Sequence, residues 1–269
     1  MTPTPGDNIL SFLSYNMQVG VGTKRYHEYI TRGWRHVLPS RQVHENLGRI
    51  AELVAQHDFV GLQELDAGSR RSGHLNQLEW LAQHAGFHYW RAQVNRDLGQ
   101  LAQHGLGLLA RFTPFAVSEH KLPGRIPGRG ALIARFGQPQ QALAVVVTHL
   151  ALTPGSRSQQ LAAICDLLAA DEHAIVMGDT NCSAEQLATD NALAASHLHI
   201  HRPDLPTFPS WNPRRGIDHI LTTPGIQVVD ARALDVRLSD HRPLQMRLAL
   251  PAELYRTLQD SATLSHTLD

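Results

Sequence analysis

The sequence predicts an α/β fold in which strands and helices alternate along the chain. Two observations lead to this class. Short apolar runs alternate with longer segments whose apolar residues recur every three to four positions, the spacing of a helix face. In addition, most of the apolar runs end in Asn, Asp, Glu or His, as strands do where an open α/β sheet holds a ligand.

The first third of the chain is predicted to hold two strands and two helices. The run ILSFLSY predicts a strand over 9–15, and FVGLQE predicts a second strand over 59–64. Between them, apolar residues at helical spacing predict a helix over 41–56, and a second helix is expected over 75–86.

The remainder of the chain adds strands and one long helix. Apolar runs bounded by Gly, Pro or polar residues predict strands over 105–112, 130–136, 142–150, 216–223, 226–234 and 243–250. The helical run SRSQQLAAICDLLAA over 156–170 leads into a buried strand that ends at Met177. The segment from Gly20 to Pro39 has no regular pattern, and a loop of that length suits a functional role.

One domain is expected over 1–250, because neither an internal repeat nor a linker divides the chain. A chain of 269 residues is long enough to bury a substantial core. Residues 251–269 are polar and only weakly helical, which predicts a C-terminal tail.

Composition narrows the class of protein. Lys plus Arg equals Asp plus Glu at 24 each, so the formal net charge is zero, which argues against a strongly basic nucleic-acid surface and leaves a local basic patch open. Cys165 and Cys182 form neither a disulfide framework nor a zinc-binding spacing. The N-terminus lacks the pattern of a signal peptide, and no apolar run approaches the roughly 20 residues of a membrane span. A cytoplasmic protein without a transmembrane segment is expected, and its oligomeric state stays open.

The stretch VMGDTNC, residues 176–182, holds the most informative strand end. The chain breaks at Gly178 and presents Asp179 and Asn181, which point the same way if the strand continues, so both could address one ligand. The same residues are ordinary turn formers. The other strand ends favour a shared ligand, because they too carry only Asn, Asp, Glu or His. These residues are Asn16, Glu64, His149, Asp218, Asp240 and His241.

The ordered set YN…QE…TH…GDTN…ID…SDH, over residues 14–243, resembles the endonuclease/exonuclease/phosphatase (deoxyribonuclease I-like) superfamily, as a bacterial-type member. Each motif is weak by itself, and their order and spacing carry the resemblance. The resemblance implies a four-layer αββα sandwich, a divalent metal and hydrolysis of a phosphoester.

The metal implied by the resemblance is Mg²⁺ or Mn²⁺. These ions prefer hard oxygen ligands, which Glu64 and the amide oxygen of Asn16 would provide. Asp240 is expected to assist the metal through water.

The catalytic residues implied by the resemblance are two carboxylates, two histidines and an amide. His241 would shuttle a proton or hold the phosphate, with Asp218 as its orienting partner. Asp179 would orient or deprotonate the attacking water, or protonate the leaving group. Asn181 and His149 would donate hydrogen bonds to the phosphoryl oxygens.

Arginines and one further histidine are weaker candidates. Arg71 matches an Arg-Ser pair of bacterial members and is expected to bind substrate, because a guanidinium suits a phosphate. Arg125 and Arg129 are loop candidates of lower rank. His219 neighbours Asp218 on a strand, so it is expected to point to the other face and to be structural.

Three classes of function compete. A phosphodiesterase that acts on a small or lipid-linked phosphodiester is favoured, and aromatic residues of the loop over 20–39 could line its substrate site. A DNA or RNA nuclease is the first alternative, weakened by the balanced charge and by departures from the family pattern at Gln18, Leu106 and Thr180. An inactive binding module on the same fold is the second, and the intact catalytic set argues against it.

Overall fold

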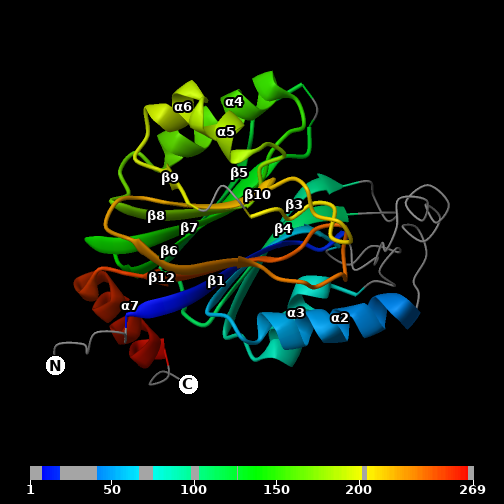
Figure 1. Ribbon diagram of the computed structural model, residues 1–269. Helices are drawn as coiled ribbons and strands as arrows, with labels where there is room; N and C mark the ends of the chain where they lie inside the picture. Colours follow the sequence, from blue (N-terminus) through cyan, green and yellow to red (C-terminus); the bar gives the residue numbers. More distant parts are fainter. Residues whose placement is uncertain are drawn as a thin grey trace.

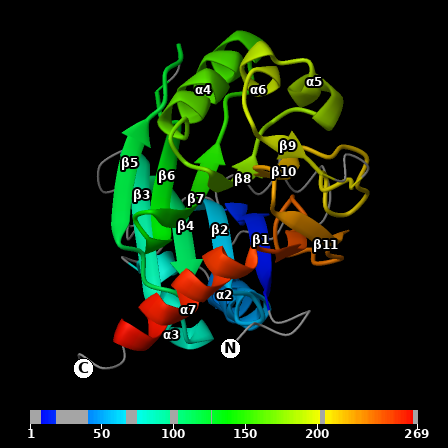
Figure 2. The same cartoon turned by 90° about the vertical axis from the view of Figure 1, so that its left-hand side faces the viewer.

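The computed structural model describes residues 8–18, 41–66, 75–97, 103–125, 127–201 and 205–265. Within these residues, two six-stranded sheets pack face to face, and helices cover their outer faces (Figures 1 and 2). The layered α/β sandwich predicted from the sequence is therefore confirmed. The loop expected over 20–39 lies outside the described residues.

The first sheet has the strand order β11-β12-β1-β2-β4-β3. Its strands are β1 (Ile9–Asn16), β2 (Phe59–Leu65), β3 (Tyr89–Asp97), β4 (Gln103–Ala110), β11 (Gln227–Ala233) and β12 (Leu244–Ala249). Helices α2 (Arg41–Val54) and α3 (Gln77–Ala85) cover its outer face (Figure 1). Strands β1 and β2 are parallel neighbours, so their carboxyl ends lie side by side.

The second sheet has the order β5-β6-β7-β8-β10-β9. Its strands are β5 (Ala116–Lys121), β6 (Gly130–Gln138), β7 (Gln141–His149), β8 (His173–Asp179), β9 (His199–Ile200) and β10 (Asp218–Thr222). Helices α4 (Pro154–Leu167), α5 (Ala184–Ala188) and α6 (Asn191–Ala194) lie on its outer side (Figure 1). None of the described helices is long and apolar enough to cross a membrane.

Aromatic side chains fill the space between the two sheets. Phe12 of β1 and Phe59 of β2 stack with ring centroids 4.8 Å apart. The edge of Phe59 meets the ring of Phe136, on β6 of the other sheet, at 5.0 Å. These rings are fully buried, and aromatic pairs of this geometry add to the stabilisation that burial alone provides.

Strand register brings the polar strand ends together. His149 at the end of β7 pairs with Asp179 at the end of β8, and Asp179 pairs in turn with Asp218 at the start of β10. In the first sheet, Asn16 pairs with Gln63, next to Glu64. The polar residues that the sequence places at separate strand ends therefore meet at one edge of the sandwich.

The structure contains elements that the sequence pattern did not predict. Strands β3 and β5 lie at the edges of their sheets, and β5 alternates between partly buried and exposed residues, so neither forms an apolar run. The segment expected to be a C-terminal tail contains helix α7 (Ala252–Ser265), which packs against β6 and β7. Leu254 and Leu258 of this helix are fully buried, because their spacing of four places both on one face.

Candidate active site

A histidine between two aspartates forms the centre of the site. Nδ1 of His241 lies 2.9 Å from Oδ2 of Asp218, and Nε2 of the same ring lies 3.7 Å from Oδ2 of Asp179. All three residues are buried. Phe208 packs against the imidazole, with ring centroids 5.0 Å apart. The ring is therefore fixed between the ends of β8 and β10.

Asp179 collects polar groups from both sheets. Its Oδ2 lies 3.4 Å from Nε2 of His149 and accepts a hydrogen bond of 3.2 Å from Nδ2 of Asn16. Its Oδ1 accepts a hydrogen bond of 2.9 Å from the backbone N–H of Asn181. Counting His241, four of the other residues expected to form the site thus lie around this one carboxylate.

Glu64 joins this cluster through Asn16. Nδ2 of Asn16 donates to Oε1 of Glu64 at 3.2 Å, while Oδ1 of Asn16 accepts from the backbone N–H of Gln18 at 3.2 Å. The amide nitrogen therefore faces the carboxylates, and the amide oxygen that was expected to bind metal does not. Metal binding by this oxygen requires the amide to rotate and exchange the two atoms.

The backbone is unusual at three positions around the site. Gln18, Glu64 and Asn181 have positive φ angles of 44°, 56° and 55°, and they are the non-glycine residues with positive φ in the described part of the chain. Glu64 lies where the register of β2 and β4 shifts, and a bulge of this kind redirects a side chain. Left-handed residues cluster at functional sites because the surrounding structure compensates their strain.

Burial and neighbouring charges shift the pKa values of the central pair. Burial raises the pKa of Asp179 to about 7, with Asp218 adding to the increase and His241 opposing it. Burial alone would lower the pKa of His241, but the carboxylates of Asp218 and Asp179 outweigh it and raise that pKa to about 10. At neutral pH, His241 is therefore a cation, and Asp179 is poised to gain or lose a proton.

Asp218 has one oxygen engaged and one free. Its Oδ2 accepts hydrogen bonds from His241 and from the hydroxyl of Thr207, whereas its Oδ1 is buried without a partner among the described residues. Thr207 was not singled out in the sequence, because an isolated loop threonine gives no signal of a contact made across the fold.

The segment from Ser239 to His241 connects the two sheets. The Ser239 hydroxyl donates to the backbone carbonyl of Asn16 at 2.6 Å and accepts from the backbone N–H of His241 at 3.2 Å. Burial raises the pKa of Asp240, with His241 opposing the increase and Glu64 adding to it. Asp240 is thus close enough to Glu64 for the two charges to interact.

Arg129 lies close enough to the site for its charge to interact with two carboxylates there, although it ranked low on sequence alone. Burial lowers the pKa of its guanidinium, and the carboxylates of Asp179 and Glu64 raise it in opposition. Arg129 has no hydrogen bond or ion pair through its guanidinium among the residues that the structure describes. Arg125 of the same loop is exposed. The other arginine candidate, Arg71, lies outside the described residues.

Three residues remain outside the cluster for structural reasons. His219 directs Nε2 to the backbone carbonyl of Cys182 at 3.0 Å, and burial lowers the pKa of its ring. Leu106 is part of the apolar cluster between the sheets. The hydroxyl of Thr180 donates to the backbone carbonyl of Ile217 at 3.0 Å.

The donor set fits a divalent metal. Ligand oxygens of Asp179 and Asp218 lie within 4.8 Å of each other, and Glu64 and Asp240 add carboxylates nearby, whereas the protonated ring of His241 offers no lone pair to a metal. The unpartnered oxygen of Asp218 is a donor that the protein itself leaves free. Oxygen donors of this kind suit Mg²⁺ or Mn²⁺.

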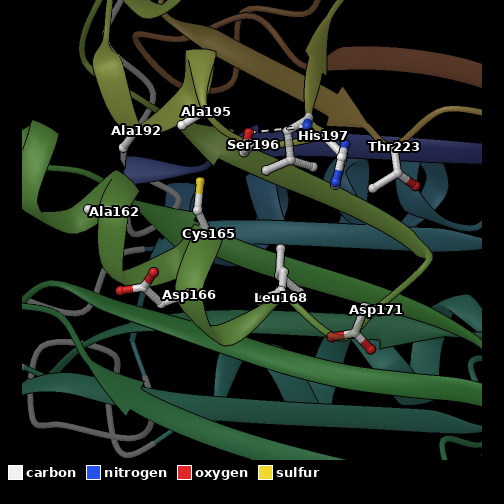
Figure 3. Close-up of a pocket in the computed structure, with 12 residues that line it drawn as sticks. Ala162, Cys165, Asp166, Leu168, Asp171, Ala192, Ala195, Ser196, His197 and Thr223 are labelled. Carbon is white, nitrogen blue, oxygen red and sulfur yellow. Dashed lines mark hydrogen bonds between the residues drawn. The ribbon is translucent and has the colours of Figure 1, made fainter.

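A cavity of about 340 Å³ lies away from this site, between α4 and α6 (Figure 3). It is lined by Cys165, Asp171, Ser196, His197, Thr223 and apolar neighbours. Asp171 and Thr223 lie near the start of β8, whereas Asp179 ends that strand. Seven residues of strand separate the two sites by about 20 Å.

The two packed sheets, with a buried Asp–His–Asp cluster and a glutamate at one edge, are typical of a class of phosphoester hydrolases. The chain belongs to the endonuclease/exonuclease/phosphatase family, whose model matches residues 13–241. No curated protein sequence matches the chain.

Solved structures share this fold at low sequence identity. An endonuclease/exonuclease/phosphatase from Beutenbergia cavernae is 20% identical, with a TM-score of 0.69, over 90% of this chain and 72% of its own. A mannosyl-6-phosphatase from Bacteroides thetaiotaomicron is 17% identical, with a TM-score of 0.66, over 89% and 99%. D. rerio TDP2 complexed with single-strand DNA product is 17% identical, with a TM-score of 0.65, over 90% and 99%. These likenesses establish the fold.

Proposed function

We propose that the protein is a divalent-metal-dependent phosphoester hydrolase, and more specifically a phosphodiesterase that acts on a small or lipid-linked phosphodiester. The observation that carries this proposal is the cationic His241 held between two buried carboxylates, beside Glu64. A phosphodiester needs its negative charge balanced and a proton moved to the leaving oxygen, and this arrangement offers both.

Glu64, Asn16 and Asp240 would hold Mg²⁺ or Mn²⁺, Asn16 after rotation of its amide. When bound, the metal would neutralise charge on a phosphoryl oxygen and on the leaving oxygen. Each of the three lies within the network that surrounds Asp179 and His241. Asp218 would be a further oxygen donor, because its Oδ1 has no protein partner among the described residues.

The side chains of the cluster divide the remaining work. Asp218 accepts a hydrogen bond from Nδ1–H of His241, which leaves Nε2 directed at the reaction centre. Asp179 can exchange a proton near neutral pH and would orient or deprotonate the attacking water, or protonate the leaving group. His149 would donate a hydrogen bond to a phosphoryl oxygen, and Asn181 would do so through its second amide hydrogen, because the first is bonded to the carbonyl of Leu150. Arg129, and Arg71 outside the described residues, would bind the phosphate as guanidinium donors.

The net charge of the chain supports a small substrate. A protein that tracks nucleic acid neutralises several phosphates with Lys and Arg, whereas this chain has a formal net charge of zero. A small or lipid-linked phosphodiester presents one or two phosphates, which the site can bind without an extended basic surface. The proposal also includes a single domain over 1–250. It further includes a cytoplasmic location, which the two unpaired cysteines support.

Metal dependence tests the proposal directly. Hydrolysis of bis-p-nitrophenyl phosphate should stop in EDTA and return when Mg²⁺ or Mn²⁺ is added in excess. Glu64→Gln should weaken the response to metal, because it removes an anionic donor beside Asn16. Full activity of the metal-stripped protein would contradict the proposal.

A substrate panel separates the three classes of function. Duplex DNA, abasic DNA, single-stranded RNA, phospholipids and inositol phosphates should be assayed in parallel at two salt concentrations, with His241→Ala as the blank. Fast cleavage of a lipid or small diester, with a shallow salt dependence of binding, is expected. Fast DNA cleavage with a slope worth about six or more phosphates would identify a nuclease. Binding without turnover of any substrate would identify an inactive module.

A further inference from the structure

Helix α4 packs behind two loops that carry residues of the proposed site. The first loop follows His149 at the end of β7, and the second follows Asp179 at the end of β8. Arg157 and Gln160 lie three positions apart in the first turns of α4, so they share one face of the helix. Arg157 is 7% exposed and Gln160 is fully buried.

Arg157 binds backbone carbonyls of both loops. Its Nη1 lies 3.4 Å from the carbonyl of Ala151, 3.1 Å from that of Leu152 and 3.4 Å from that of Asn181. No carboxylate within 4.0 Å pairs with it among the described residues. A guanidinium stays charged in proteins, so a buried one needs these carbonyls as its partners.

Gln160 extends the same support to a third loop. Its Oε1 accepts a hydrogen bond of 2.8 Å from the backbone N–H of Ala151, and its Nε2 donates one of 2.8 Å to the carbonyl of Pro123. Pro123 belongs to the loop between β5 and β6, which also carries Arg129. Within that loop, the backbone N–H of Leu122 donates to the carbonyl of Arg129 at 3.0 Å.

Asn181 needs such support because of its backbone conformation. Its φ of 55° is unfavourable for a side chain with a Cβ, yet it lets the N–H of Asn181 reach Oδ1 of Asp179 at 2.9 Å. The side-chain amide nitrogen donates to the carbonyl of Leu150 at 2.9 Å. Arg157 contacts the backbone carbonyl of the same residue at 3.4 Å.

We propose that Arg157 and Gln160 are positioning residues, which hold the loops after His149 and Asp179 in register so that Asn181 caps the Asp179 carboxylate. Neither residue has to touch the substrate for this role. The kinetic part of the test rests on the proposed phosphoester hydrolysis, and the structural part does not.

Amide hydrogen exchange tests the structural part. Arg157→Gln should speed exchange at Ala151 and Asn181 by at least about tenfold, because the bonds of both amides lose their shared support. Arg157→Lys, which keeps the charge and part of the hydrogen bonding, should restore most of the protection. Arg135→Gln is the matched control, since Arg135 donates to the carbonyl of Leu167 at the other end of α4 and pairs with Asp171. It should leave exchange at Ala151 and Asn181 unchanged.

A double-mutant cycle tests the kinetic part. Arg157→Gln should lower kcat on bis-p-nitrophenyl phosphate by about 10- to 100-fold, as a misplaced catalytic group does. In an Asp179→Ala background, the same substitution should change kcat by less than about threefold, because the carboxylate that the backbone N–H of Asn181 caps is gone. Arg135→Gln should lower the melting temperature without this pattern.

Several results would overturn the inference. They are unchanged exchange at Ala151 and Asn181 in both Arg157 variants, the same local increase in Arg135→Gln, or kcat losses that add in the double mutant. A wild-type protein that hydrolyses no phosphoester would refute the proposed function, while the exchange measurement would still decide whether Arg157 holds the two loops.

Discussion

The two ends of β8 each carry an aspartate, and the two aspartates differ in what balances their charge. Asp171, two residues before the strand, is gripped by Arg135, whose Nε and Nη2 donate to its two oxygens at 2.8 and 2.6 Å. Asp179, the last residue of the strand, has two histidines at 3.4 and 3.7 Å and the amide of Asn16 at 3.2 Å. No arginine pairs with it within the described residues.

This difference predicts a structural role for Asp171 and a chemical role for Asp179. A bidentate guanidinium balances the charge of a carboxylate with two charge-assisted hydrogen bonds. Histidines and amides compensate it less, so burial raises the pKa of Asp179 to about 7 and the protonated form becomes accessible. On the proposed function, the absence of such an ion pair at Asp179 among the described residues leaves that carboxyl group free to exchange a proton during the reaction.

Substitutions that remove the charge of Asp179 or of Asp171 test this comparison, and their expected effects are the largest. Asp179→Asn should lower kcat on bis-p-nitrophenyl phosphate by at least about 10²-fold, the usual loss for a positioned acid or base. Its stability should stay the same or rise, because the substitution removes a carboxylate whose ionised form is penalised by burial.

Asp171→Asn should do the reverse. Loss of the ion pair with Arg135 should lower the free energy of unfolding by about 1–3 kcal/mol. The kcat of the folded enzyme should not change. Steady-state kinetics and urea unfolding of both variants provide the measurement, and a kcat loss in Asp171→Asn as large as that in Asp179→Asn would erase the distinction.

The pairing of Asp218 with His241 predicts non-additive losses at the site end. His241→Ala and Asp218→Asn should each lower kcat by about 10²-fold, and the double mutant should be little worse than His241→Ala alone, since Asp218 acts through the histidine. His219→Ala is the control, because its ring contacts the carbonyl of Cys182 instead. Additive losses, or a large kcat loss in His219→Ala, would mean that the contacts of Asp218 have been misassigned.

Sequence patterns predicted the buried strands well, because a strand covered on both faces is a continuous apolar run. The strand expected over 59–64 is Phe59–Leu65, and the one over 142–150 is Gln141–His149. The edge strands β3 and β5 were missed, since a strand with one exposed face and polar residues lacks such a run. The packing of α7 was missed because its two buried leucines lie in an otherwise polar segment.

The candidate site was predictable where strand ends carry it, and less so where loops do. Register alone brings His149, Asp179 and Asp218 together, and the strand pattern implied that meeting. Arg157 and Thr207 contact the site's loops and carboxylates from distant positions in the chain, and no local pattern announces such contacts. The chemical roles of these residues stay predictions.

Arg129 offers a smaller test at the site end. Arg129→Gln should raise KM and the inhibition constant of inorganic phosphate by about tenfold, because a charge-assisted hydrogen bond to phosphate is worth roughly 1.5–3 kcal/mol. The kcat should fall less than KM rises. Arg125→Gln removes an exposed guanidinium from the same loop and should change neither constant. Equal effects of the two substitutions would mean that Arg129 contributes only general positive charge and not a specific hydrogen bond to phosphate.

The smallest expected effect is a pH dependence of stability that the site end alone produces. The folded-state pKa of His241, about 10, lies above its ordinary value of 6.5, so its protonated form stabilises the fold. That contribution is fully present below pH 6.5 and is lost as the pH rises toward 10.

The contribution of Asp179 to stability has the same sign and is lost earlier, as the pH rises from 3.8 to about 7. In EDTA, the free energy of unfolding should therefore fall by about 1–2 kcal/mol between pH 7 and pH 8. His241→Ala should abolish most of this fall, whereas His219→Ala should keep it, because the lowered pKa of His219 affects stability only below pH 6.5. A fall of equal size in His241→Ala would show that another group titrates in this window, and that the two carboxylates do not hold the proton on His241.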